Sequence, residues 1–175
     1  MVSSFTLKQK LARLMRLPFL HQLMVWGMKA IVPRQRIGVS LIALDEQERV
    51  FLLKHVFHPN APWGPPGGWL GRNEAPATGV LRELYEETGL TAVIGPVVHM
   101  ALEEKPTHIG IAYLAQIQPG ALKLSPEILE ADWFAVDNLP QPQYSFTEQA
   151  IKTAVQIQRS NGDNRKNVLK QPPPW

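Results

Sequence analysis

The feature that most constrains the fold of this 175-residue chain is a short helix with a sharply marked beginning and end. Pro76 suits the first turn of a helix, and Gly89 suits the position just past its last turn. The sequence therefore predicts a helix over residues 76–88. The apolar side of this helix, together with Tyr85 and Thr88, is expected to pack on a sheet.

The other side of the predicted helix carries three carboxylates. On a helical wheel, Glu83, Glu86 and Glu87 share an arc of about 100°, and Arg82 can pair with Glu86 as an i, i+4 neighbour. Like charges this close destabilise a helix unless something neutralises them, so a solvated acidic face is the alternative to a binding site. Hard oxygen ligands favour Mg²⁺ or Mn²⁺, and Mg²⁺ commonly takes one or two carboxylates plus substrate phosphate. The glycine-rich loop over residues 55–73 favours a site, because it holds backbone carbonyls and a substrate close to the metal.

The remaining patterns predict an α/β or α+β domain with a mixed sheet. Strands are expected at residues 37–44, 49–54, 92–101, 109–118 and 132–136. The first two are interpreted as a hairpin with buried faces, and residues 55–73, with four prolines and four glycines, as a loop. A last helix is expected to begin at Ser145 and to end near Asn161 and Gly162.

Charge is distributed unevenly along the chain. Residues 1–36 carry seven basic side chains and no acidic one, residues 37–158 carry fourteen acidic and seven basic ones, and residues 159–175 are basic again. A basic chain suggests a nucleic-acid binder, but the central part, which should hold the site, is acidic. Because the chain contains no cysteine, a disulfide scaffold, a thiolate zinc site and a cysteine nucleophile are excluded.

Residues 1–36 are expected to form a basic amphipathic helical extension, with one helix over residues 6–16 and a second apolar stretch over residues 19–32. The second stretch is too short and too polar to cross a membrane, and no clear signal-peptide cleavage site precedes Pro33. Two interpretations stay open: a helix on an anionic membrane surface, or one that packs on its own domain or on a second subunit. The second is preferred because most amphipathic helices bury their apolar stripe in protein.

We therefore divide the chain into three parts. Residues 1–36 form the extension, residues 37–160 form the domain that holds the site, and residues 161–175 form a basic tail that is expected to be disordered.

The segment from Gly68 to Leu90 resembles the signature of the Nudix hydrolase family. That signature consists of a glycine, five residues, a glutamate, seven residues, and then Arg-Glu-aliphatic-x-Glu-Glu-x-Gly-aliphatic. Its fixed positions are filled here by Gly68, Glu74, Arg82, Glu83, Leu84, Glu86, Glu87, Gly89 and Leu90. The resemblance implies an α/β/α sandwich with a mixed sheet and an enzyme that uses a divalent metal to hydrolyse a pyrophosphate linkage.

The resemblance also assigns roles by position. The three helix carboxylates resemble the metal-binding acids of the family, and the Gly68 carbonyl resembles its backbone ligand, for Mg²⁺ or Mn²⁺. Arg82 would orient these acids, and Glu74 would brace the loop against the helix.

The general base differs between branches of the family. In some branches it is the first glutamate of the helix, here Glu83, and in others it is a carboxylate from a later loop. Among the later acids we rank Glu127 first, followed by Glu130 and by the pair Glu103 and Glu104, although each alone could equally be a surface acid.

The expected substrate is a nucleoside diphosphate derivative, with ADP-ribose or another nucleoside diphosphate sugar or nucleotide favoured. Candidates for stacking on a base or sugar ring, or alternatively for plain packing, are Phe57, His58, Trp63 and Trp69. The position of Pro106 resembles a spacing seen in ADP-ribose pyrophosphatases. The alternatives are an RNA 5′-end pyrophosphohydrolase that uses the basic ends, and a non-catalytic nucleotide-binding module.

The expected partner is a small nucleotide, and the amphipathic extension adds a homodimer as a further expectation. Nucleic acid is kept open as a less favoured partner, and a membrane surface is not expected. The expected location is the cytoplasm.

Overall fold

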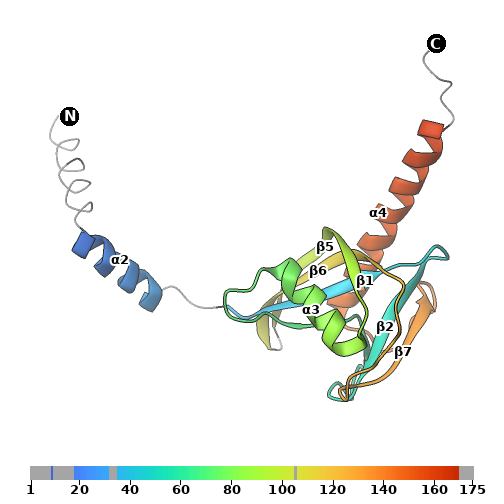
Figure 1. Cartoon of the computed structure of the whole chain (residues 1–175), viewed down its shortest axis with the longest axis horizontal. Coiled ribbons are helices and arrows are strands. Elements are labelled where there is room, and N and C mark those ends of the chain that lie inside the picture. Colours follow the sequence, from blue (N-terminus) through green and yellow to red (C-terminus); the bar gives the residue numbers. More distant parts are fainter. Residues whose placement is uncertain (1–8, 10–17, 32–34, 105, 170–175) are drawn as a thin grey trace, which may run out of the picture. The chain divides into compact units, whose positions relative to one another are not determined.

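The computed structural model describes residues 9, 18–31, 35–104 and 106–169. The chain divides into two units, with the division between Gln35 and Arg36, and each unit is described by itself. The first unit contains α2 (Pro18–Ile31) (Figure 1), and the helix expected over residues 6–16 lies, apart from residue 9, outside the described residues. Within the described ranges, no helix combines the length and the hydropathy that a membrane crossing requires.

The second unit contains the remaining elements. In chain order these are β1 (Ile37–Ala43), β2 (Arg49–His55), β3 (Trp63–Gly64), β4 (Gly67–Trp69), α3 (Pro76–Thr88), β5 (Ala92–Glu104), β6 (Thr107–Ile117), β7 (Ile128–Ala135) and α4 (Ser145–Leu169). One sheet has the order β4-β1-β6-β5, and the other has the order β3-β2-β7. Strands β1 and β6 are parallel, whereas the other pairs are antiparallel. The expected α/β fold with a mixed sheet is confirmed.

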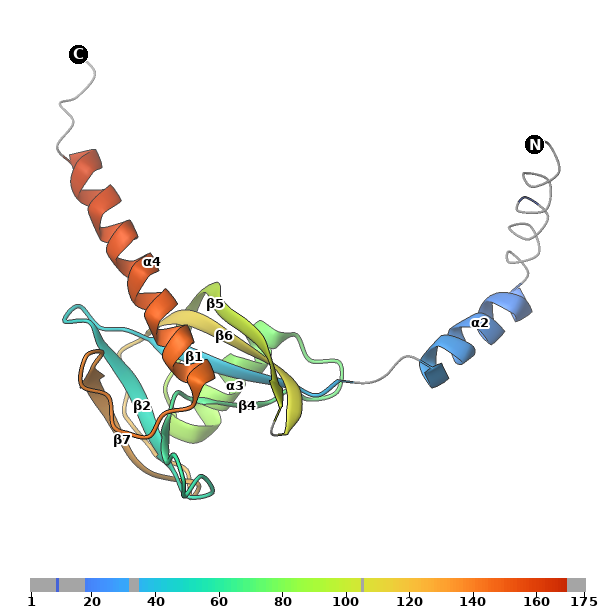
Figure 2. The same ribbon diagram turned by 180° about the vertical axis from the view of Figure 1, so that it is seen from behind.

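The two sheets lie between α3 on one side and α4 on the other (Figures 1 and 2). Successive side chains of a strand point to opposite faces, so β1 and β2 contribute to two separate cores. Val39 and Leu41 pack with Leu84 of α3, whereas Ile42 packs with Ile151 of α4. This alternation explains why both strands are apolar along most of their length.

The prediction of a hairpin between the first two strands is wrong. Strand β1 pairs with β4 on one edge and with β6 on the other, so neither edge is free for β2. A single bridge between Leu44 and Val50 is what remains of the expected ladder, and β2 continues into the other sheet. The two strands separate because each edge of β1 is already satisfied by a strand that lies further along the chain.

Two segments contain more regular structure than predicted. The expected loop over residues 55–73 includes the short strands β3 and β4. Helix α4 continues to Leu169, so the prediction of a helix end near Asn161 and Gly162 is wrong, while the disordered tail stays a prediction. A glycine inside a helix costs about 1 kcal/mol relative to alanine, which is not by itself a stop, and Gly162 lies within α4. Residues 170–175 lie outside the described residues.

Helix α3 has the predicted bounds, and Gly89 ends it in the left-handed conformation with φ of 70°. The expected packing of Tyr85 on the sheet is wrong, because its side chain is 61% exposed. The buried stripe of α3 is centred on Val80 and Leu84. Tyr85 follows Leu84 by about 100° around the helix, which carries it past the edge of the sheet.

Candidate functional site

The three carboxylates of α3 differ in their environments. Glu87 is only 9% exposed, and one of its oxygens accepts a hydrogen bond of 3.0 Å from the backbone N–H of Gly67 on β4. Glu83 lies against Gly68, since a Cβ atom added at Gly68 would be 2.5 Å from the Glu83 carboxyl carbon. Glu86 is exposed. Glycine at position 68 therefore allows the backbone of β4 to approach Glu83 closely, and the N–H of its neighbour Gly67 holds Glu87.

Arg82 connects the acids to the loop that precedes the helix. Its Nη1 donates to Glu83 at 2.9 Å and to Glu86 at 3.0 Å, while its Nε and Nη2 donate to the two oxygens of Glu74 at 2.8 and 2.9 Å. Glu74 also accepts a 2.8 Å hydrogen bond from the backbone N–H of Gly71. The hydrogen bonds from Arg82, and then the one from Gly71, lower the pKa of Glu74 to about 2. The Arg82 guanidinium thus connects the loop to the helix through hydrogen bonds.

Burial is the main reason why the pKa of Glu87 is raised to about 8, and the negative charges of Glu83, Glu127 and Glu86 add to the effect. His55, at the end of β2, places its Nδ1 3.7 Å from Glu87. Burial, with a smaller contribution from His58, lowers the pKa of His55 to about 4. In the absence of a bound cation, the pKa shifts of both groups favour their neutral forms near pH 7, so their contact is not an ion pair.

The acids border a cavity of about 470 Å³, which we name the acid cavity. Its lining includes Gly67, Gly68, Glu83, Glu86, Glu87, Ser125, Pro126 and Glu127, together with the rings of His55, Phe57, His58 and Trp69. In the part of the chain that the structure describes, no three acidic or histidine side chains converge on one point as they do around a bound ion. Arg82 accounts for this, because it draws Glu83 and Glu86 toward itself.

The donor set of the acid cavity nevertheless fits a hard divalent cation. It offers carboxylate oxygens and the backbone beside Gly68, with no sulfur ligand. Burial, and then the negative charges of Glu83, Glu127 and Glu86, raise the pKa of Glu87, so its ionised form lacks a compensating positive charge. The space that a Cβ atom would fill at Gly68 is occupied by the Glu83 carboxylate, which keeps the backbone and this acid together. A cation bound here would relieve the repulsion among the acids.

A second cavity of about 280 Å³ adjoins the first, and we name it the aromatic cavity. Its aromatic lining consists of His55, His58, Trp69, His108, Tyr144 and Phe146. The residues that line both cavities are His55, His58, Gly67, Gly68 and Trp69. One molecule can therefore extend from the carboxylates into the aromatic cavity.

Most of the loop residues predicted for substrate binding reach this region, but Trp63 does not. Phe57, His58 and Trp69 line the acid cavity, whereas the Trp63 ring packs on Phe134 with a centroid distance of 4.8 Å. Trp63 belongs to strand β3, and its pairing with β2 directs the ring into the core under α4. Sequence composition cannot distinguish two loop tryptophans that belong to different strands.

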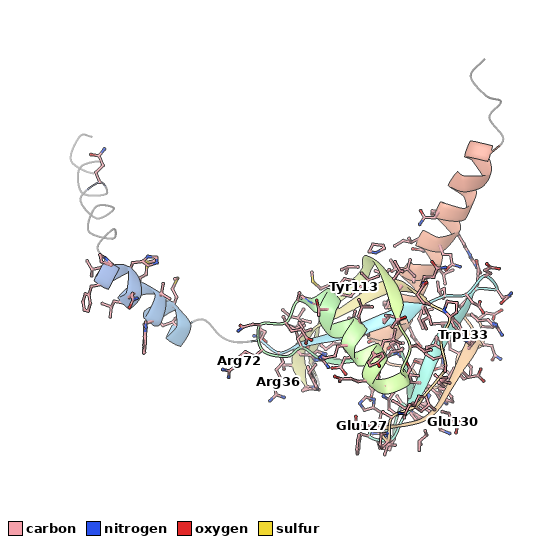
Figure 3. All side chains as sticks on the ribbon, viewed as in Figure 1. Arg36, Arg72, Tyr113, Glu127, Glu130 and Trp133 are labelled. Carbon is pink, nitrogen blue, oxygen red and sulfur yellow. The ribbon has the colours of Figure 1, made fainter. Side chains whose placement is uncertain are left out.

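The four acids predicted as alternative general bases lie in different environments. Glu127 lines the acid cavity. Glu130 forms a 2.6 Å ion pair with Lys54, although both acids lie at the end of the unit where β7 begins (Figure 3). Glu103 lines the aromatic cavity, as does Pro106, while Glu104 lines neither.

Several residues of the site were missed by the sequence analysis. His55 lines both cavities. Tyr144, His108 and Ser40 line the aromatic cavity alone. His55 ends an apolar strand pattern, and Ser40 interrupts one; these polar positions within apolar strands were the available signal.

The fold and the site define an α/β/α domain that places a carboxylate cluster next to an aromatic cavity. The chain belongs to the NUDIX family, since the model of that family, described as the NUDIX domain, matches residues 34–154. The expected membership of this family is confirmed.

Among curated proteins, the chain is similar to the NAD-capped RNA hydrolase NudC of Salmonella heidelberg (strain SL476), with 26% identity over 126 residues. The match covers 70% of this chain and 49% of that protein, so the chain spans about half the length of the curated relatives it matches. The corresponding proteins of Salmonella typhi and Salmonella newport (strain SL254) match at the same identity and coverage.

Solved structures share the fold. The MutT NUDIX hydrolase from Burkholderia pseudomallei is 28% identical with a TM-score of 0.59, and the match covers 69% of this chain and 98% of that one. An ADP-ribose pyrophosphatase from Streptococcus suis 89-1591 is 21% identical with a TM-score of 0.61, covering 72% of this chain and 93% of that one. At that lower identity the likeness concerns the fold alone.

Proposed function

We propose that the chain is a divalent-metal-dependent hydrolase that cleaves the pyrophosphate linkage of a nucleoside diphosphate derivative. ADP-ribose or another nucleoside diphosphate sugar or nucleotide is the favoured substrate. The observation that carries the proposal is the shared wall of the two cavities, which includes His58, Gly68 and Trp69. A diphosphate beside the carboxylates would leave the attached ring system next to the aromatic side chains.

Glu83, Glu86, Glu87 and the Gly68 carbonyl are the groups that would hold Mg²⁺ or Mn²⁺. Such an ion neutralises phosphate oxygens, activates water and steadies the leaving phosphate. The chain contributes the positions of these groups in advance, because Arg82 fixes two of the acids by hydrogen bonds. The remaining acid, Glu87, is held by the N–H of Gly67.

Two acids compete for the role of general base. Glu127 lines the acid cavity, and its negative charge is felt at Glu87. Glu83 also lines the cavity, but Arg82 holds one of its oxygens at 2.9 Å. We therefore propose Glu127 first and Glu83 second. If Glu127→Gln retains full activity, Glu127 is not the general base and Glu83 is proposed instead.

The name of the Salmonella relatives supports an RNA 5′-end substrate as a second candidate. Residues 1–36 carry seven basic side chains and no acidic one, which suits contact with phosphates. This candidate predicts an affinity for RNA that falls as salt rises and is lost when residues 1–36 are deleted. RNA affinity that does not depend on salt or on residues 1–36 would reject it.

A homodimer through residues 1–36 and a cytoplasmic location are also retained as proposals. Light scattering on the full chain and on a chain without residues 1–36 tests the first. Fractionation of cells that express the full chain tests the second.

Product identification by chromatography tests the activity. The purified chain with Mg²⁺, and separately with Mn²⁺, would be given ADP-ribose, other nucleoside diphosphate sugars, dinucleoside polyphosphates, nucleoside triphosphates and 5′-triphosphate RNA. The proposal expects cleavage of one class by the wild type and none by Glu87→Gln. If nothing is cleaved while nucleotides still bind, the chain is a non-catalytic nucleotide-binding module.

A further inference from the structure

We propose that the aromatic cavity selects a nitrogen heterocycle that carries an exocyclic amine, such as adenine, and that Glu103 and His108 are the residues that read this amine. The inference rests on the proposed function for its assumption that the phosphates lie at the acid cavity. It goes further by naming the chemical group that the other end of the substrate must present.

Two glycines let aromatic side chains of the protein lie close to the sheet beside the aromatic cavity. Gly38 and Gly110 are paired neighbours on β1 and β6, and neither places a side chain on the floor. A Cβ atom added at Gly110 would lie 2.7 Å from the Phe146 ring, and one at Gly38 would lie 3.0 Å from the His108 ring. The rings thus pack directly on the backbone of the sheet. Together with Trp69, they surround a space that suits a planar aromatic ligand.

Glu103 supplies a carboxylate at this cavity. It belongs to β5, where it pairs with His108 of β6 across the antiparallel ladder. Alternation along β5 directs Glu103 to the face of the cavity and the following residue, Glu104, to the other face. An ionised carboxylate only accepts hydrogen bonds, so a ligand group that meets Glu103 must donate.

His108 supplies a second acceptor. Its Nδ1 lies 2.6 Å from the carbonyl oxygen of Pro106, and a carbonyl oxygen accepts, so Nδ1 carries the proton. In the neutral ring the other nitrogen, Nε2, then has a free lone pair. The ring is also held edge-to-face against Trp69, with a centroid distance of 4.8 Å. The tautomer and the position of the ring are therefore both fixed by the protein.

A hydroxyl group also lines the aromatic cavity. Hydroxyl groups such as Ser40 Oγ, which is buried there without a hydrogen-bond partner in the described part of the chain, can donate as well as accept. Glu103 and, in the tautomer that the Pro106 carbonyl selects, His108 Nε2 are both acceptors.

The inference follows from these two acceptors. Adenine and cytosine present an amine where hypoxanthine and uracil present a carbonyl oxygen. A carbonyl oxygen placed against Glu103 would oppose two acceptors, and a site built to accept from an N–H rejects an analogue that lacks it. Amine-bearing rings should therefore bind more tightly than the carbonyl counterparts.

The test measures binding of nucleoside 5′-monophosphates, which carry no pyrophosphate linkage to be cleaved. Calorimetry with the full chain would compare AMP with IMP and CMP with UMP. Hydrogen bonds to a charged group predict a preference of about 10- to 100-fold in Kd for the amine-bearing member of each pair. Glu103→Gln should reduce the preference to within about threefold, because the amide can also donate.

Two further variants complete the test. Glu104→Gln removes a neighbouring carboxylate that lines neither cavity, so it should leave the preference unchanged. His108→Phe keeps a ring against Trp69 but removes the acceptor, and should weaken the preference without a large change in melting temperature.

Equal affinity within both pairs, or no binding of any monophosphate, would overturn the inference. A preference for the amine together with no hydrolysis of any pyrophosphate would keep the inference and reject the proposed hydrolase.

Discussion

Replacing Glu87 with glutamine should make the metal-free protein more stable than the wild type at alkaline pH. Burial, and then the charges of neighbouring acids, raise the pKa of Glu87 from 4.5 to about 8 in the folded state. Between these two pH values the folded chain keeps a proton that the unfolded chain has lost. The unfolded state binds fewer protons, so the free energy of unfolding falls as the pH rises. Glutamine cannot ionise, and the variant avoids this loss.

The magnitude follows from the same interval. One pH unit corresponds to about 1.4 kcal/mol, so the interval from 4.5 to about 8 gives about 5 kcal/mol as an upper bound. Rearrangement of the site around an ionised Glu87 reduces this figure. We expect the free energies of unfolding of wild type and variant to be close at pH 5, with the variant ahead by about 2 to 5 kcal/mol at pH 9.

Urea unfolding in the presence of a chelator, from pH 5 to pH 9, measures this difference. Subtracting the wild type from Glu87→Gln cancels the titration of groups that both proteins share. Glu86→Gln is the matched control, because the Glu86 side chain is 57% exposed and should show little pH-dependent gain. A difference between Glu87→Gln and wild type that stays constant within about 0.5 kcal/mol from pH 5 to pH 9 would refute the reasoning.

Three other outcomes are expected. At pH 8, Mg²⁺ at 100 times its Kd should stabilise the wild type by about 2.7 kcal/mol, and Glu87→Gln by clearly less, in urea unfolding. Gly68→Ala should lower kcat/KM at least about a hundredfold with little change in melting temperature, because its Cβ displaces the flexible end of Glu83. Gly27→Ala, whose Cβ would meet nothing within 4 Å and which lines neither cavity, is the control. In thermal or urea unfolding, Leu84→Ala should cost about 2 to 5 kcal/mol, whereas Tyr85→Ala should stay within about 0.5 kcal/mol.

Local signals account for the parts of the fold that the sequence predicted well. Pro76 and Gly89 mark the ends of α3 through their own backbone preferences, which need no distant partner. The arc of three carboxylates follows from the geometry of one helix. The alternating pattern of the strands likewise depends on neighbouring residues.

Features that depend on strand pairing could not be predicted in this way. The separation of β1 from β2 is decided by β4 and β6, which lie further along the chain. The different positions of Trp63 and Trp69 follow from the same pairing, because one ring belongs to β3 and the other to β4. The role of Glu103 depends on the ladder between β5 and β6, which brings it to the cavity beside His108.

Strand β4 has only three residues, yet it connects the two halves of the site. Its Gly67 N–H holds Glu87, its Gly68 backbone touches Glu83, and its Trp69 forms a wall of the aromatic cavity. A ligand that shifts β4 from either side must therefore change the other side as well. Occupancy of the aromatic cavity and cation binding by the acids are then thermodynamically linked, and each should alter the affinity of the other by the same factor.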